Sequence, residues 1–342
     1  MKRKETFTIL LTAIAFILYI NGIENTFLAI LSLAIGLILI LKVGDPTTEG
    51  FKGLSEYTGL SEYTTGMISS IASNLPETML AIFMVLSPHL REIAFLTVML
   101  TSAFNGLLLG LLVIVLTWKG GAIKVPREAL EYDVEIMRIT ISLSVLIFGT
   151  GLILNVFHGD PVLPVEAPLF LLLVYIVYFY FISTRTKNRR RIKSKTWIPK
   201  LVIGLIGTVI SAELLSSSME FFVEERGLHV VLAATLIAFA GSIPEHGLAV
   251  LGALKGHVEL GVSNLISGII QSIMLVLPLL ALVVPLTLDG YILYQFLAIA
   301  TTLWIIKKAI IDDGMLTIDE GVSISLAHLL GILLFDELSR LI

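Results

Sequence analysis

Apolar residues run along this chain in long stretches that short polar connections separate. A helix needs roughly 20 such residues to cross a bilayer, and about eleven stretches approach or exceed that length. The pattern therefore predicts an all-α, polytopic membrane protein of about 11 transmembrane helices. The predicted spans are residues 6–20, 25–43, 65–87, 93–117, 135–157, 165–184, 199–219, 229–252, 258–285, 289–306 and 319–337.

The composition agrees with this interpretation. The chain is 56% hydrophobic and 15% charged, with a mean hydropathy of +0.95, whereas a soluble domain carries about 25% charged residues. Cysteine is absent, which excludes disulfides and thiolate metal sites. The sequence contains no phosphate loop, nucleophile triad or zinc motif. We therefore expect neither an enzyme nor a nucleic-acid-binding protein.

The amino-terminal segment resembles a signal peptide, because a basic start precedes an apolar run. It lacks a small-residue cleavage site, and a second span follows closely. We therefore expect residues 1–24 to be a retained additional transmembrane helix.

The distribution of basic residues predicts which connections share a side of the membrane. The most basic segment, residues 183–195, is expected in the cytoplasm, with its positions 185–195 bound to anionic lipid headgroups. Counting spans outward makes the amino terminus cytoplasmic. We expect the membrane to be the plasma (cell) membrane. The other connections assigned to the cytoplasmic side are 44–64 (although acidic), 118–127, Lys255 and Lys307/Lys308. The opposite side receives 157–164, 219–227 and 286–290.

Two Pro-Glu pairs mark an internal repeat. Gly59 lies 18 residues before Glu77, and Gly227 lies 18 residues before Glu245. Five predicted spans follow the same plan in each half, and an odd number forces the second copy to enter from the opposite face. This is the inverted-repeat plan of secondary transporters, whose ion sites lie near the midplane. The predicted organisation is an extra helix (1–24), a first repeat (25–184), a basic cytoplasmic loop (185–198) and a second repeat (199–342).

Each Pro-Glu pair would place an unpaired backbone carbonyl and a carboxylate inside the hydrocarbon, where both are energetically unfavourable. Pro76 lacks an N–H, so the carbonyl of Ala72 loses its helical partner, and Pro244 does the same to Ala240. The alternative is a pair of kinked helices whose glutamates meet basic side chains. No lysine or arginine occurs near the middle of a predicted span, however. A carboxylate at such a depth indicates ion or proton binding.

Further oxygen donors recur at helical spacing around both pairs. Ser73 lies one helical turn before Glu77, Ser242 lies three residues before Glu245, and the following spans carry amide and hydroxyl rows. Carboxylates, hydroxyls and carbonyls are ligands for sodium or calcium. The small residues can equally serve helix packing, and Asn264 can instead brace the crossing between repeats. The candidate cation ligands are Glu77, Glu245, Ser73, Asn105, Thr101, Ser242, Ser272, Gln271 and Asn264.

Two histidines stand apart from this set. Successive residues of a helix point about 100° apart, so His246, although adjacent to Glu245, is expected to pack or to lie at the surface. His328 is expected to pair locally. Neither histidine is a predicted ligand.

These motifs resemble the α-repeats of the cation/calcium exchanger superfamily. The matching segments are "ASNLPE" with "LTVMLTSAFNG" and, more closely, "AGSIPE" with "LGVSNLISGIIQSIMLVL". The resemblance implies ten helices in two inverted five-helix repeats and alternating access, with the spans at 25–43 and 199–219 sliding across the core. By position, it implies the cation ligands Ser73, Glu77, Thr101, Asn105, Gly241, Ser242, Glu245 and Ser272.

The sequence departs from the family pattern at several positions, and these changes leave fewer candidate cation ligands. Gly241 stands where threonine is usual, and Gly268 with Ile269 replaces Ser-Asn. Two carboxylates remain, which balance one calcium ion or two monovalent cations or protons. We therefore expect a secondary-active sodium/calcium antiporter without a cofactor. Proton/calcium (or other cation) exchange is the alternative, and a cation channel or a non-transporting ion-binding membrane protein is a second one.

Overall fold

A computed structural model describes residues 3–118, 121–124, 127–159, 161–185, 195–254 and 258–338. It confirms the all-α class, because every predicted span coincides with one or more helices. The helices are α1 (Arg3–Asn21), α2 (Thr26–Thr58), α3 (Glu62–Ser73), α4 (Leu75–Leu86), α5 (Arg91–Thr117), α6 (Arg127–His158), α7 (Glu166–Arg185), α8 (Trp197–Arg226), α9 (Val230–Leu254), α10 (Val258–Gln271), α11 (Leu277–Val283), α12 (Gly290–Asp312), α13 (Ile318–Leu333) and α14 (Phe335–Leu338). The other elements are a π-helical turn, η1 (Ser272–Val276), and two short strands, β1 (Ala122–Lys124) and β2 (Met315–Thr317).

The described helices include six that are long and apolar enough to cross a membrane, or seven if the bent pair α3 and α4 forms one span. Three shorter apolar helices, Glu5–Asn21, Glu166–Phe181 and Val230–Phe239, add to these. Large apolar side chains are exposed on α1, α6 and α7, for example Leu10, Leu146 and Phe170, as expected for faces that contact lipid. The chain is an integral membrane protein, and the number eleven stays a prediction.

Two helices continue well past the spans that hydropathy predicts. Residues 44–58 belong to α2, so the predicted loop at 44–64 is wrong over most of its length, and α8 runs on to Arg226. Each helix ends at a glycine in the left-handed conformation, Gly59 with φ 82° and Gly227 with φ 62°. Glycine adopts this conformation without steric cost. The two glycines that align in the sequence therefore have the same structural role, whereas the inverted orientation of the halves stays a prediction.

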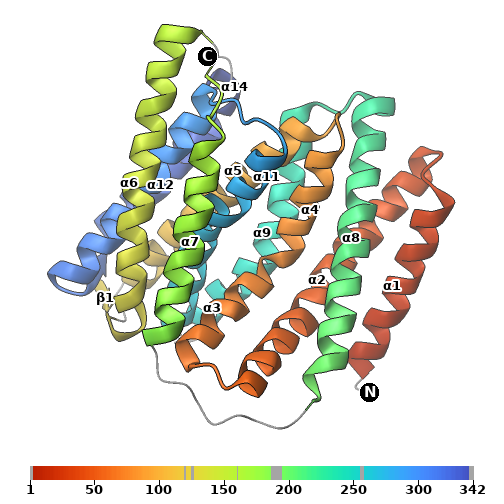
Figure 1. The fold of residues 1–342 in the computed structure, drawn as a ribbon, viewed down its shortest axis with the longest axis horizontal. Coiled ribbons are helices and arrows are strands. Elements are labelled where there is room, and N and C mark those ends of the chain that lie inside the picture. The colour runs from red at the N-terminus through yellow and green to blue at the C-terminus, as the bar shows by residue number, and fades with distance from the viewer. Residues whose placement is uncertain are drawn as a thin grey trace. The chain divides into compact units, whose positions relative to one another are not determined.

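The chain divides into two compact units. Unit 1 contains Met1–Ala94 and Phe179–Gly241, and unit 2 contains Phe95–Tyr178 and Ser242–Ile342. Each unit therefore combines segments from both halves of the sequence. In unit 1, α8 packs against α1, α2 and α4 (Figure 1).

In unit 2, α12 packs against α6 and α13, and connections pair at two places. Strand β1 pairs antiparallel with β2, and Val162 forms a bridge with Thr287. Connections that the charge pattern assigns to one side thus lie against each other. Which side faces the cytoplasm stays a prediction, and positions 186–194 of the basic segment fall outside the described residues.

Candidate cation site

The first Pro-Glu pair lies at a break between two helices. α3 ends at Ser73, α4 begins at Leu75, and the two helices are bent by 48°. Pro76 is the second residue of α4, in the first turn where a missing N–H costs no helical hydrogen bond, and Glu77 follows it. The peptide dipoles at a helix amino terminus favour a negative charge there. Ser73 and Glu77 thus lie on opposite sides of the break, not on one regular helix.

The Glu77 carboxylate lies beside Gly241 of α9, within unit 1. Glu77 is partly buried, and a Cβ atom added at Gly241 of α9 would lie 2.9 Å from its Oε1 atom. The glycine therefore leaves room for this carboxylate. A side chain at position 241 would have to displace it.

The second Pro-Glu pair does not interrupt its helix. α9 continues from Val230 through Pro244 to Leu254. The side chain of the candidate ligand Glu245 lies outside the described residues. Ser242, one turn earlier, is wholly buried, and its Oγ atom has no hydrogen-bond partner in the described part of the chain.

Helix α5 brings the amide of Asn105 into unit 2. Asn105 and Thr101 are 1% and 5% exposed. A Cβ atom added at Gly268 of α10 would lie 2.8 Å from Nδ2 of Asn105 and 3.1 Å from Cε1 of His246. Helices α5, α9 and α10 therefore meet closely at Gly268.

His246 packs inside unit 2. Its side chain is 1% exposed, and its Nδ1 atom lies 2.7 Å from Oδ1 of Asn264. Of the two expectations for His246, packing is therefore confirmed and a surface position is wrong. The predicted ligand Asn264 contacts this ring.

The remaining predicted ligands, of which Gln271 and Ser272 are buried and Ser73 is partly buried, bond to residues three or four positions earlier in the chain. Nε2 of Gln271 donates to Oγ of Ser267 at 2.8 Å, and Oγ of Ser272 donates to the carbonyl of Gly268 at 2.9 Å. On α3, Oγ of Ser73 donates to the carbonyl of Ser70 at 2.9 Å. The π-helical turn η1 begins at Ser272, and such turns are frequent at functional sites.

His328 does not pair locally. Its Nε2 atom lies 2.9 Å from Oγ1 of Thr302, which belongs to α12. The ring packs on Gly106 of α5, where an added Cβ would meet it at 2.0 Å. His328 therefore joins α13 to two other helices of unit 2.

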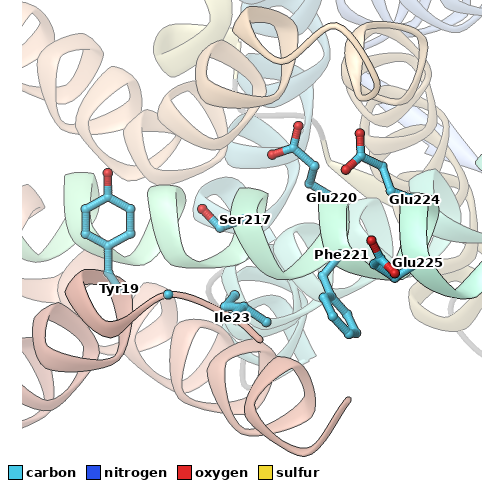
Figure 2. A pocket seen from close by; sticks show the side chains of 8 residues that line it. Tyr19, Ile23, Ser217, Glu220, Phe221, Glu224 and Glu225 are labelled. Atoms are coloured by element: carbon cyan, nitrogen blue, oxygen red, sulfur yellow. The ribbon is translucent and has the colours of Figure 1, made fainter. Parts of the chain in front are cut away.

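A separate pocket of about 380 Å³ lies in unit 1, where the last turns of α8 approach α1. Figure 2 shows the carboxylates of Glu220, Glu224 and Glu225 among its lining side chains. Oγ of Ser87 donates to Glu220 at 2.5 Å, and His89 lies 2.7 Å from Glu224. Two of these carboxylates therefore tie α8 to the connection between α4 and α5.

Solved exchangers share this fold. The H⁺/Ca²⁺ exchanger CAX superposes with a TM-score of 0.71 at 16% identity, over 97% of this chain and 89% of CAX. YfkE superposes with a TM-score of 0.65 at 18% identity, over 96% and 99% of the two chains. The sodium-calcium exchanger NCX_Mj superposes with a TM-score of 0.60 at 18% identity, over 89% of this chain and 97% of NCX_Mj.

Sequence comparison identifies the family. The inner membrane protein YrbG of Escherichia coli (strain K12) is 25% identical over 141 residues, which are 41% of this chain and 43% of YrbG. The match thus spans less than half the length of that relative. The model of the sodium/calcium exchanger protein family matches two segments, residues 28–184 and 197–335. These matches confirm the resemblance: the chain belongs to the sodium/calcium exchanger protein family.

Proposed function

We propose that this membrane protein is a secondary-active antiporter that exchanges calcium for sodium by alternating access, with a cation site built on Glu77 and Glu245. One observation carries the proposal: the Glu77 carboxylate lies at a helix break within an apolar span, against Gly241 of the second Pro-Glu segment. Broken helices whose amino-terminal ends line an ion site are a feature of secondary transporters. Family membership supports cation exchange.

The charge of the proposed site favours exchange over simple binding. Two carboxylates balance one calcium ion or two sodium ions, and a net charge left in a low-dielectric site is costly. Occupation by one kind of cation therefore excludes the other. Ser73, Thr101, Asn105 and Ser242 are the proposed neutral ligands, which add oxygen atoms without changing this balance.

Flux measurements on vesicles test the proposal. We expect calcium uptake by reconstituted vesicles to require an outward sodium gradient and to stop when that gradient is removed. Uptake driven only by an outward proton gradient would show that protons, not sodium ions, are the coupling ions. Calcium flux without any counter-ion requirement would indicate a channel and would refute antiport.

A single methyl group at position 241 should weaken cation binding without unfolding the protein. In Gly241→Ala, the new Cβ would lie 2.9 Å from Oε1 of Glu77, which is the movable end of a flexible side chain. The carboxylate can rotate away, so the fold is kept while the ligand is displaced. We expect calcium affinity, measured by isothermal titration, to fall about tenfold, which corresponds to about 1.4 kcal/mol.

The control for this variant is Gly149→Ala on α6, where an added Cβ meets no atom within 4 Å. It should leave calcium affinity unchanged. Equal affinity in Gly241→Ala and wild type would show that the Glu77 carboxylate does not bind the cation in the conformation described.

A further inference from the structure

A histidine ring in unit 2 presents a nitrogen atom that the protein does not use. Nδ1 of His246 lies 2.7 Å from Oδ1 of Asn264. Because an amide oxygen only accepts hydrogen bonds, Nδ1 must carry the proton. In the neutral ring, Nε2 then holds a lone pair. This atom is buried and has no hydrogen-bond partner among the described residues.

Other polar atoms without partners lie close to this nitrogen. Both amide atoms of Asn105 are buried, and no described residue bonds to them. A Cβ added at Gly268 would lie 2.8 Å from Nδ2 of Asn105 and 3.5 Å from Nε2 of His246, so the amide and the ring both border Gly268. Ser242 lies four residues before His246 and therefore on the same face of α9. Its buried Oγ is also without a partner in the described ranges.

A cluster of buried polar atoms without partners indicates that a ligand binds there. Buried polar atoms are nearly always bonded, because each unmade hydrogen bond costs free energy. An unprotonated imidazole nitrogen, an amide that binds through its oxygen and a hydroxyl together form a ligand set for a cation.

The nitrogen atom decides which cations this set prefers. Calcium and sodium take oxygen ligands, whereas imidazole binds zinc, nickel and other late first-row divalent metals. Histidine ligands of such metals characteristically donate the other ring N–H to an oxygen, which orients the ring. Asn264 provides that oxygen to His246.

We propose that Nε2 of His246, with the amide of Asn105 and the hydroxyl of Ser242, forms a nitrogen-bearing part of the cation site that accepts zinc-like divalent ions. The inference rests on the proposed function, because Asn105 and Ser242 are ligands in that proposal. It makes His246 a selectivity-determining ligand and Asn264 the residue that positions it. Zinc thereby becomes a cargo, or a competitor of calcium, at the same site.

Binding measurements on the full chain in detergent micelles test the assignment. Zinc and calcium are titrated separately into wild type, His246→Gln and the control His89→Gln. His89 is an exposed histidine beside Glu224, so it reports zinc held at the surface. We expect the ratio of zinc to calcium affinity to fall at least about tenfold in His246→Gln and to stay unchanged in His89→Gln. An unchanged ratio in His246→Gln would overturn the assignment.

X-ray absorption of the zinc-loaded wild type provides a test that does not depend on the folding of a variant. We expect at least one imidazole nitrogen at about 2.0 Å from zinc. A shell of oxygen atoms alone would refute the assignment, as would an imidazole signal that persists in His246→Gln. The absence of gradient-coupled calcium uptake in wild-type vesicles would instead refute antiport. The two tests are independent, because the absorption spectrum reports the zinc ligands whether or not transport occurs.

Discussion

Replacing Glu77 by glutamine should abolish gradient-coupled calcium uptake, and Glu245→Gln should do the same. In the proposed site, each change removes one of the two negative charges that would balance the divalent ion, and it leaves the volume of the side chain nearly unchanged. Removing one partner of a buried charge pair costs roughly 2–5 kcal/mol, equal to about 30-fold to 4,000-fold in affinity. Initial rates of calcium uptake under an outward sodium gradient measure the effect.

Glu166→Gln is the matched control for these variants. Glu166 is an exposed carboxylate in the first turn of α7, so its loss should leave the uptake rate unchanged. The thermal unfolding midpoint of each variant checks that the fold is kept. Uptake at the wild-type rate in both Glu77→Gln and Glu245→Gln would eliminate the two-carboxylate site.

Hydropathy located the helices but not the ends of two of them. Residues 44–58 carry Asp45, Pro46 and Glu49, which look like a loop when apolar spans are sought. A helix that leaves the hydrocarbon remains a helix if it still packs, and α2 contacts α8 from Gly36 to Gly53 in unit 1. The true ends lie at glycines with positive φ, and a search for capping residues would have found them.

The candidate site could be predicted in composition but not in its contacts. A carboxylate in an apolar span is costly wherever it lies, so the sequence alone was enough to predict Glu77 as a candidate ligand. Helical spacing then grouped residues that share one helix. It could not show that Gly241 and Glu77 lie together, or that His246 meets Asn105 across Gly268, because contacts between helices depend on packing. The burial of His246 also depends on packing, and its position about 100° around the helix from Glu245 left that burial open.

Glycine residues bring α2 and α8 unusually close in unit 1. A Cβ at Gly50 would lie 2.6 Å from Cα of Leu201, and one at Gly204 would lie 2.6 Å from the backbone nitrogen of Thr47. Small residues allow helices in membrane proteins to approach until their backbones touch. The obstructing atoms belong to the backbone, so a side-chain rotation cannot relieve the clash. The two helices must separate if either glycine is enlarged.

Gly50→Val should therefore destabilise the protein strongly, whereas Gly44→Val on the same helix should not. An added Cβ at Gly44 meets no atom within 4 Å, so this control changes helix propensity alone. We expect Gly50→Val to lower the free energy of unfolding by about 3 kcal/mol. This loss corresponds to a fall of roughly 6–12 °C in the thermal unfolding midpoint in detergent. Equal midpoints for the two variants would show that α2 and α8 do not require this close approach. A fall only in Gly50→Val would establish that the backbone contact at Leu201 stabilises the helix pair.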